Sequence, residues 1–275
     1  MTAVDQYAGE HDLETPDSTQ VRFGIEYLDR DLAAATAVMS MSMDRFRNPF
    51  TGAPTVGPLA ILVDAAAGIV NHYRRRPGQW TVSSELSMDL SIDGIGDLDG
   101  PVIATAHALG PRGVTSLGIC TLTYRGAVIG SGTVRSYFIE ADDVVAQHRP
   151  ETLRRTAETT FADLMAAHVR ADTDAYVLSQ NVDENLNNDI HIVHGGVAAA
   201  GLELASSAAV NHGNSADLLQ TASLRVNFLR PFFAGTDSRY EGKALRVGRG
   251  SAVGDAQAIG DDGRVALTAR ITAYR

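Results

Sequence analysis

The sequence predicts an α+β protein made of two tandem copies of one domain, each with a long central helix wrapped by an antiparallel β-sheet. Two nearly all-apolar helices, several runs that alternate apolar and polar residues, and a constant spacing between matching landmarks support this prediction. The step along the sequence from Asp64 to Glu203 is almost the same as the step from Tyr137 to Tyr274, close to half the length of the chain. A period this long indicates a duplicated domain, since solenoid repeats are only about 20–50 residues long.

The composition limits the partners and sites that we expect. The chain has 275 residues and a formal net charge of −10, which argues against binding to nucleic acid or to an anionic membrane. Its single cysteine, Cys120, excludes an internal disulfide and a zinc site built from cysteines, and we expect it to be a small buried hydrophobe. No apolar run reaches the ~18 residues of a membrane helix, and the N-terminus has no apolar secretion segment. We therefore expect a cytoplasmic protein.

The repeat divides the chain into four segments. A polar, acidic lead-in comes first, followed by one copy of the domain, a linker helix and the second copy. The expected boundaries are 1–18, 19–142, 143–170 and 171–275. Within the linker, the helix is expected between about Glu151 and Val169.

Each copy is expected to pass from strand-like residues through a central helix into further strands. Residues 21–43 are either strands or a short helix followed by a strand. Pro58 suits the first turn of a helix that runs to about His72 and is apolar except for Asp64. A helix that is hydrophobic on all sides is buried, and the corresponding helix of the second copy is expected over residues 197–210. Further strands are expected over residues 86–92, 102–109, 114–124, 127–138, 177–181, 224–228, 239–247, 251–259 and 265–274.

The most informative stretch lies at the start of the second central helix. Asn188, His194, Gly195 and Gly196 stand directly before a small-residue apolar helix that carries one acid, Glu203. Amides at a helix start lack intrahelical partners and favour negative charge, and glycines allow a ligand or another backbone to come close. The stretch therefore offers an anion site, a histidine, a side-chain amide and a carboxylate.

This pattern resembles that of the hotdog-fold acyl-CoA thioesterases, the phenylacetate-pathway (PaaI-like) type in particular. In that family an asparagine is followed, after five residues, by His-Gly-Gly and then by an acid on the helix, and the five residues named above fall in register with it. Two copies in one chain resemble a double hotdog, a covalent version of the dimer that single-hotdog members form. The resemblance implies an enzyme that hydrolyses an acyl-CoA thioester to free acid and CoA, with no cofactor beyond the CoA of its substrate.

Helix geometry places the expected site between the two copies. Gly195 and Glu203 are eight residues apart on one helix, which is roughly 12 Å of rise. A carbonyl bound at the helix start is therefore out of reach of that helix's own acid and must meet the acid of the other copy. The resemblance implies the same, because the sites of hotdog thioesterases are generally shared between two subunits.

Two candidate sites follow, each made of one copy's acid and the other copy's helix start. The first comprises Asp64, Asn188, His194, Gly195 and Gly196. The second comprises Glu203, Ser207, Thr55, Val56 and Gly57, with Pro49 in place of the asparagine. Gly68 of the first copy stands where Ser207 stands in the second. We expect the first site to be catalytic because its loop pattern is intact, and the second to be degenerate or altered for binding.

For the first site we expect thioester hydrolysis. The Gly195 amide would bind the thioester oxygen and its developing negative charge. Asp64 would act as a general base on water, or attack the carbonyl and form an anhydride, and the sequence leaves both routes open. Asn188 would position the water or the acid, and His194 would orient the thioester or the helix start. Arg112 and Arg249, beside glycines in matching turns, are expected to contact CoA phosphates unless they are only solvated.

Other interpretations of the same residues stay open. Either acid could be a buried structural group, and His194 could simply cap its helix. A hotdog enoyl-CoA hydratase is one rival function, because Asp189 and His194 have the spacing that this family uses, although the family's Asn-Pro between them is missing. A non-catalytic acyl-CoA binding protein is another rival. The resemblance also implies that double-hotdog chains associate further into a homo-oligomer.

Overall fold

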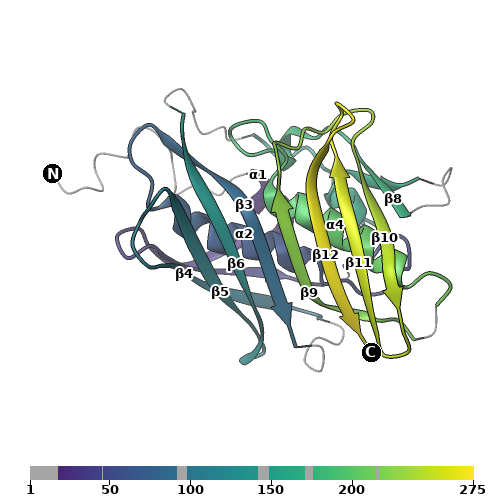
Figure 1. Cartoon of the computed structure of the whole chain (residues 1–275). Coiled ribbons are helices and arrows are strands. Elements are labelled where there is room, and N and C mark those ends of the chain that lie inside the picture. The colour runs from purple at the N-terminus through teal and green to yellow at the C-terminus, as the bar shows by residue number, and fades with distance from the viewer. Residues whose placement is uncertain (1–17, 45, 92–97, 142–148, 171–175, 215–216) are drawn as a thin grey trace.

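A computed structural model describes residues 18–44, 46–91, 98–141, 149–170, 176–214 and 217–275. In these residues one antiparallel sheet of 12 strands curls around two long helices, α2 (Gly57–His72) and α4 (Gly195–Val210). Figure 1 shows both helices lying against the same face of the sheet, one behind each half. The predicted α+β double hotdog is confirmed.

The first half of the sheet runs in the order β1-β2-β4-β5-β6-β3 and packs on α2. A short helix, α1 (Ser18–Phe23), precedes it, so residues 21–43 form a short helix followed by two strands. The strands are β1 (Glu26–Asp31), β2 (Thr36–Ser42), β3 (Gln79–Leu90), β4 (Pro101–Leu109), β5 (Thr115–Tyr124) and β6 (Ala127–Glu140).

The second half runs in the order β9-β12-β11-β10-β8-β7 and packs on α4. Its short helices are α3 (Phe161–Leu164) and the 3-10 turn η2 (Glu184–Leu186). Its strands are β7 (Ala167–Val169), β8 (Tyr176–Gln180), β9 (Gln220–Phe228), β10 (Arg239–Val247), β11 (Ser251–Ile259) and β12 (Val265–Tyr274).

Strands β3 and β9 join the two half-sheets. They pair antiparallel from Glu85 opposite Asn227 to Asp89 opposite Ser223. An ion pair between Arg225 and Asp89, at 2.6 Å, crosses this junction. Residues 79–84 of β3 extend beyond the pairing, and β9 ends at Phe228, so the two strands separate at one end of the junction.

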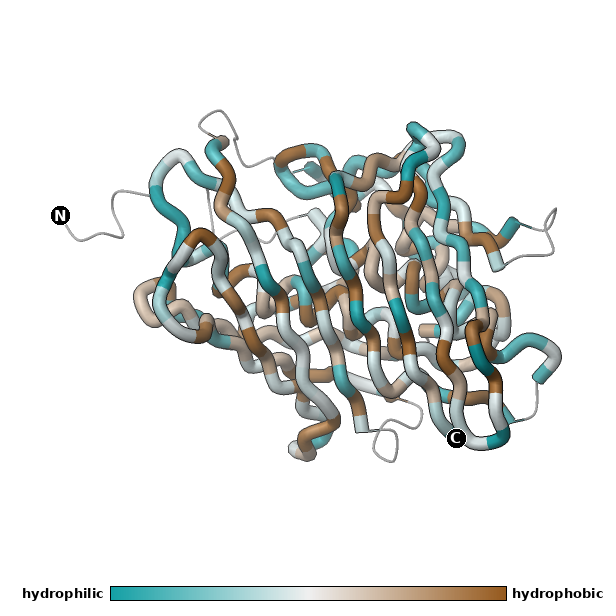
Figure 2. The backbone as a smooth tube through the Cα atoms, in the orientation of Figure 1, coloured by the Kyte–Doolittle hydropathy of each residue, from teal (hydrophilic) through white to brown (hydrophobic). Residues whose placement is uncertain are grey.

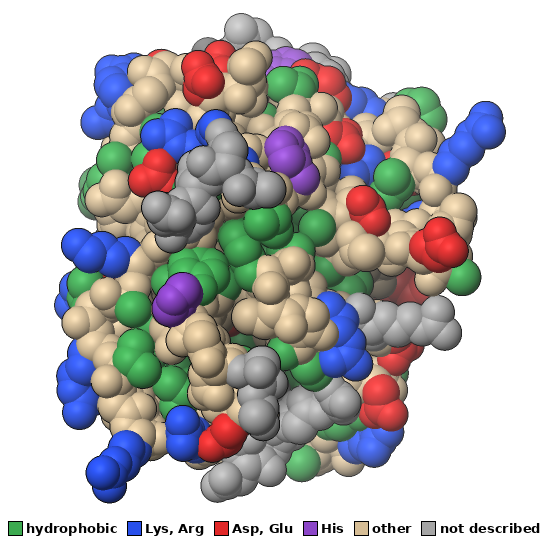
Figure 3. All heavy atoms as spheres, turned by 90° about the vertical axis from the view of Figure 1, so that its right-hand side faces the viewer, with side chains coloured by type: hydrophobic (Ala, Val, Ile, Leu, Met, Phe, Trp, Pro, Cys, Tyr) green, Lys and Arg blue, Asp and Glu red, His purple; other side chains and the backbone are tan. Residues whose placement is uncertain are grey.

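The alternation of apolar and polar residues is visible along the strands in Figure 2. In β2, Met39 and Met41 are fully buried against the core while Ser40 and Ser42 are not. The helices differ, because α2 and α4 are buried almost all round between the curled sheet and each other. At the β8–β10 end of the molecule, apolar side chains gather near the centre of the surface with charges of both signs around them (Figure 3).

The helix predicted between Glu151 and Val169 is wrong for most of its length. Residues 151–160 have no regular helix or strand, and only α3 and β7 follow. The physical reason is a tertiary contact: the buried guanidinium of Arg22 binds both carboxylate oxygens of Glu151, at 2.7 and 2.8 Å.

The predicted segment boundaries shift accordingly. Strand β7 pairs with β8, so the sheet of the second half begins inside the segment assigned to the linker. The predicted lead-in, 1–18, lies outside the described residues except for Ser18, which starts α1. None of the helices in the described ranges is long and apolar enough to cross a membrane.

Candidate active site

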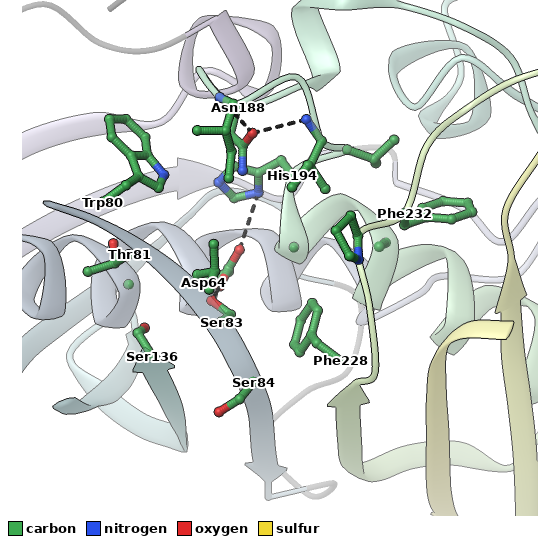
Figure 4. A pocket seen from close by; sticks show the side chains of 18 of the residues that line it. Asp64, Trp80, Thr81, Ser83, Ser84, Ser136, Asn188, His194, Phe228 and Phe232 are labelled. Carbon is green, nitrogen blue, oxygen red and sulfur yellow. Dashed lines mark hydrogen bonds and ion pairs between the residues drawn. The ribbon is translucent and has the colours of Figure 1, made fainter. Parts of the chain in front are cut away.

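A cavity of about 560 Å³ lies where β3 and β9 separate, and we call it the larger cavity because it exceeds the one at the second candidate site. Residues of α2 and of the start of α4 line it. Figure 4 shows Trp80, Thr81 and Ser136 to one side of Asp64, and Phe228 and Phe232 to the other. The lining also includes Gly68, Ile69, His72, Ser83, Asn188, His194, Gly195 and Arg230. Both halves of the chain therefore contribute to one cavity.

The carboxylate of Asp64 connects the two halves at this cavity. It comes from the middle of α2 and is only 7% exposed. Its Oδ2 atom accepts a hydrogen bond of 2.6 Å from the Gly196 amide at the start of α4. Its Oδ1 atom accepts one of 3.2 Å from the hydroxyl of Ser83 on β3. The acid of the first half thus meets the helix start of the second half, as the helix-length argument predicts.

His194 caps α4 beside this acid. Its Nδ1 atom accepts from the Gly196 amide at 3.2 Å and lies 3.4 Å from Asp64 Oδ2. Gly196 itself must be a glycine, because a Cβ there would lie 2.6 Å from the Ile61 Cα of α2. The close approach of the two helix backbones is what brings the acid to the amides.

The Gly195 amide is the open donor of the site. Gly195 lines the cavity, and its amide has no hydrogen-bond partner among the described residues. It stands at the first position of α4, where the helix dipole favours negative charge. A Cβ at Gly195 would lie 2.8 Å from Asp64 Oδ2, so only glycine leaves the donor and the acid side by side. This pair can bind an anionic oxygen next to a carboxylate.

Asn188 is held by a local turn above the cavity. Its Oδ1 atom accepts from the amides of Ile190 and Ile192, at 3.2 and 3.1 Å. Its Nδ2 group has no hydrogen-bond partner in the part of the chain that the structure describes, and the residue lines the cavity. The turn therefore fixes the side chain and leaves its amide available to a ligand.

The second candidate site lies at a smaller cavity of about 440 Å³, lined by Thr55, Val56, Glu203, Ser207 and Thr221 among others. Glu203 is 2% exposed, and its two oxygens accept hydrogen bonds from the hydroxyls of Thr221, at 2.6 Å, and Thr55, at 2.9 Å. Burial raises the pKa of Glu203, and the hydroxyl hydrogen bonds oppose that rise. The Thr55 hydroxyl also accepts from the Gly57 amide at 3.2 Å, as His194 does from Gly196. The helix starts of the two halves are thus capped alike, each by a side-chain acceptor two residues before the glycine amide.

The assignment of Pro49 to the asparagine position is wrong, because Asn48 takes that place. Its Oδ1 atom accepts from the Phe50 amide at 2.9 Å, as that of Asn188 does from Ile190. The constant spacing between the two halves points to Pro49 because the loop of the first half is one residue longer. The backbone amide of Asn48 donates to the carbonyl of Ala53, five residues on. The backbone amide of Asn188 donates to that of Ile192, four residues on.

Two hydroxyl residues of the sites were missed from the sequence. Ser83 on β3 and Thr221 on β9 each donate to the acid of their own half. Their separation along the sequence equals that of Leu86 and Leu224 on the same two strands. A search for hydroxyls at this offset would have found the pair.

The two arginines expected at CoA phosphates lie outside both cavities. The Arg112 guanidinium donates to the Arg74 carbonyl at 2.7 Å and to Gln79 Oε1 at 2.6 Å, and it stacks over the Phe138 ring. Arg249 is exposed in its turn. The arginine that does line the larger cavity is Arg230, in the exposed segment after β9.

The other titratable groups in the described residues form neither a reactive thiol nor a metal site. Burial raises the pKa of Cys120 to about 12, which agrees with a small buried hydrophobe. No cluster of three or more histidine, cysteine or acidic side chains that could hold a metal ion occurs within the described ranges.

Comparisons with known proteins agree with this architecture. Residues 191–267, from the loop before α4 to β12, match the family model of the thioesterase superfamily. No protein with a curated functional description matches the sequence.

Solved structures with the same double arrangement resemble nearly the whole chain. An acyl-CoA thioesterase II from Mycobacterium marinum is 14% identical with a TM-score of 0.58, covering 94% of this chain and 96% of its own. A tesB protein from Mycobacterium avium subsp. paratuberculosis is 10% identical with a TM-score of 0.61, covering 93% and 97%. An acyl-ACP thioesterase from Bacteroides thetaiotaomicron is 11% identical with a TM-score of 0.55, covering 89% and 100%. At such identities the likeness is one of fold.

Proposed function

We propose that this chain, of which residues 191–267 match the thioesterase superfamily, hydrolyses acyl-CoA thioesters in the larger cavity between its two halves. The observation that carries the proposal is the contact between the Asp64 carboxylate of one half and the amide end of α4 in the other. An acid and an unpaired helix-start donor, side by side in a cavity, are the two groups that acyl transfer to water requires.

In the proposed reaction the thioester oxygen accepts a hydrogen bond from the Gly195 amide. Negative charge develops on that oxygen when the carbonyl carbon is attacked, and one such donor typically contributes about 2.7–4 kcal/mol. The carbon–sulfur bond then breaks, CoA leaves as the thiol, and the acyl group leaves as a free acid with an oxygen from water.

Asp64 serves this reaction by one of two routes. It takes a proton from the attacking water, or it attacks the carbonyl itself to form an anhydride that water then cleaves. The hydroxyl of Ser83 and the Gly196 amide hold the two carboxylate oxygens in place, and each oxygen keeps a lone pair for water or substrate. His194 fixes the helix start, and the free amide of Asn188 positions the water or the thioester.

The substrate assignment rests on the walls of the cavity. Apolar side chains such as Trp80, Phe228 and Phe232 suit an acyl group, and Arg230 on the exposed segment beside them suits the phosphates of CoA. No cofactor beyond CoA is required by this chemistry.

A cytosolic location fits the single buried thiol. The phenylacetate-pathway type stays a prediction. Further assembly of the chains is also a prediction, and gel filtration tests it.

The test is a pair of variants, Asp64→Asn and Glu203→Gln, measured on a panel of acyl-CoAs by release of free thiol. We expect Asp64→Asn to lose about 10²–10⁴-fold in kcat, the usual contribution of a positioned acid or base, and Glu203→Gln to keep its turnover. The reverse result would place catalysis at the smaller cavity.

Two parallel measurements separate the rival functions. Loss of enoyl-CoA absorbance without thiol release would indicate a hydratase. The hydratase interpretation pairs His194 with Asp189, whereas in the structure the carboxylate beside His194 is that of Asp64, at 3.4 Å. Thermal stabilisation by acyl-CoA with neither change would indicate a binding protein.

A further inference from the structure

Gly68 interrupts the wall of the larger cavity one helical turn after Asp64. A Cβ at this position would meet only Asp64 Oδ1, at 3.8 Å, so no other element packs against it. The other helix-interior glycine, Gly201 of α4, is different, because a Cβ there would lie 2.5 Å from the ring of Tyr240. Gly201 is needed for packing, whereas the space over Gly68 is part of the cavity.

This glycine has a cost that packing does not explain. In a helix interior, glycine is less favourable than alanine by about 1 kcal/mol, and its neighbours Ala65, Ala66 and Ala67 show that α2 otherwise uses alanine. Since alanine would fit at Gly68 sterically, the missing side chain points to a requirement for space at the cavity.

The residues of α2 that line the cavity define the direction of that space. They are Asp64, Ala65, Gly68, Ile69 and His72, which recur on one face of the helix. From Asp64 to His72 this face is roughly 12 Å long. Trp80 and Ile139, from the strands opposite, line the same cavity. A channel with mostly apolar walls therefore runs from the acid over Gly68 along α2.

The matching place in the second half borders the smaller cavity and carries a polar side chain. Ser207 occupies the position of α4 that corresponds to Gly68 of α2, and its hydroxyl accepts a hydrogen bond of 2.9 Å from the Asn48 amide. The same amide donates to the Leu204 carbonyl at 2.9 Å. The pair ties the loop of the first half to α4 beside Glu203. At the larger cavity Gly68 offers no side-chain acceptor, and the side-chain amide of Asn188 has no hydrogen-bond partner among the described residues.

We propose that Gly68 opens an acyl channel beside Asp64, and that the Asn48–Ser207 pair makes the equivalent space beside Glu203 narrower and polar. The proposal rests on the function proposed above and names its substrate class: CoA thioesters of apolar acyl groups longer than acetyl. One chain then binds one acyl group, because the smaller, polar cavity of the duplicated site does not suit an apolar chain although it keeps its acid.

The test uses S-alkyl-CoA thioethers, which bind without being hydrolysed. Affinities and stoichiometries of the ethyl, butyl and hexyl compounds are measured by titration calorimetry for the wild type, Gly68→Leu and Gly68→Ala. In the wild type we expect one site per chain and an affinity that rises about fourfold per buried methylene, the equivalent of ~0.8 kcal/mol. Gly68→Leu should bind the ethyl compound within about twofold of wild type and lose the gain with length. Gly68→Ala, which adds one methyl group to the channel wall, should lose part of that gain.

Three results would overturn the channel: an unchanged length dependence in Gly68→Leu, no length dependence in the wild type, or two sites per wild-type chain. Retained binding of the ethyl compound shows that Gly68→Leu is folded, and Gly68→Ser provides a milder filling residue if it is not. Wild-type turnover of butyryl-CoA is followed in parallel. If the wild type shows length-dependent binding but no turnover, hydrolysis is refuted and the channel is not. If the wild type turns over butyryl-CoA but Gly68→Leu keeps the wild-type length dependence, the channel is refuted and hydrolysis is not.

Discussion

The carboxylate of Asp64 and the amide of Gly196 lie 2.6 Å apart although 132 residues separate them in the chain. The contact exists because the two central helices touch backbone to backbone at Gly196. The geometry of the candidate site therefore depends on the absence of a side chain at one position.

Gly196→Ala should lower both stability and turnover. The new Cβ would lie 2.6 Å from the Ile61 Cα and 3.0 Å from the Ala60 carbonyl, both backbone atoms that cannot rotate away. Overpacking of this kind costs about 1–3 kcal/mol, which urea denaturation measures. Gly68→Ala is the matched control, because its Cβ has space, and it should be stabilising by up to ~1 kcal/mol. Equal stabilities of the two variants would contradict the close helix contact.

Ser83→Ala should reduce kcat while leaving KM nearly unchanged. The Ser83 hydroxyl donates to Asp64 Oδ1 at 3.2 Å, and a hydrogen bond to a charged group contributes about 1.5–3 kcal/mol, or roughly 10- to 100-fold. The neighbouring Ser84 also lines the cavity, but its hydroxyl donates to the Arg135 carbonyl, so Ser84→Ala serves as the control. If both variants retain wild-type kcat, Ser83 does not position the acid.

Glu203 should make the protein less stable as the pH rises. Burial raises the pKa of Glu203 above its ordinary value of 4.5, so the folded chain holds this proton more tightly than the unfolded chain. The stability that the group contributes is therefore present below pH 4.5 and is lost as the pH rises from there through the raised pKa. Glu203→Gln lacks this titration. Unfolding free energies measured between pH 4 and 8 should show the wild type losing stability relative to the variant, and parallel curves would exclude the effect.

Arg230→Gln should weaken the use of CoA substrates through their phosphates. We expect a higher KM for acyl-CoA, because one charge-assisted contact is lost, and an unchanged KM for the corresponding acyl-pantetheine, which lacks the nucleotide phosphates. Arg249→Gln, on an exposed turn away from both cavities, is the control and should change neither value. An equal rise in KM for both substrates would mean that Arg230 acts on the acyl or pantetheine part instead.

The repeat and the two buried helices could be predicted because they depend on local patterns. An all-apolar helix such as α2 and the alternating residues of β2 are visible without knowledge of their partners. The junction of β3 with β9 was not predictable in the same way, since it pairs Glu85 with Asn227 across a long stretch of the chain. The linker helix was wrongly predicted for a similar reason. Arg22 binds Glu151, and no local sequence pattern indicates that contact.

At the site, simple helix geometry was enough to bring Asp64 to the start of α4. Ser83 and Thr221 were not predicted, because a single hydroxyl on a strand looks like any other polar position of an alternating pattern. Asn48 escaped because one additional loop residue shifts the alignment of the two halves. Arg112 was expected at a phosphate but is held by Arg74, Gln79 and Phe138.

The two halves that pair through β3 and β9 belong to one polypeptide, and this has a consequence for dilution. A cavity shared by two separate subunits disappears when the enzyme is diluted below its dissociation constant. Within one polypeptide the local concentration of each half near the other is fixed by the chain. Specific activity should therefore stay constant down to the lowest enzyme concentration that an assay can detect.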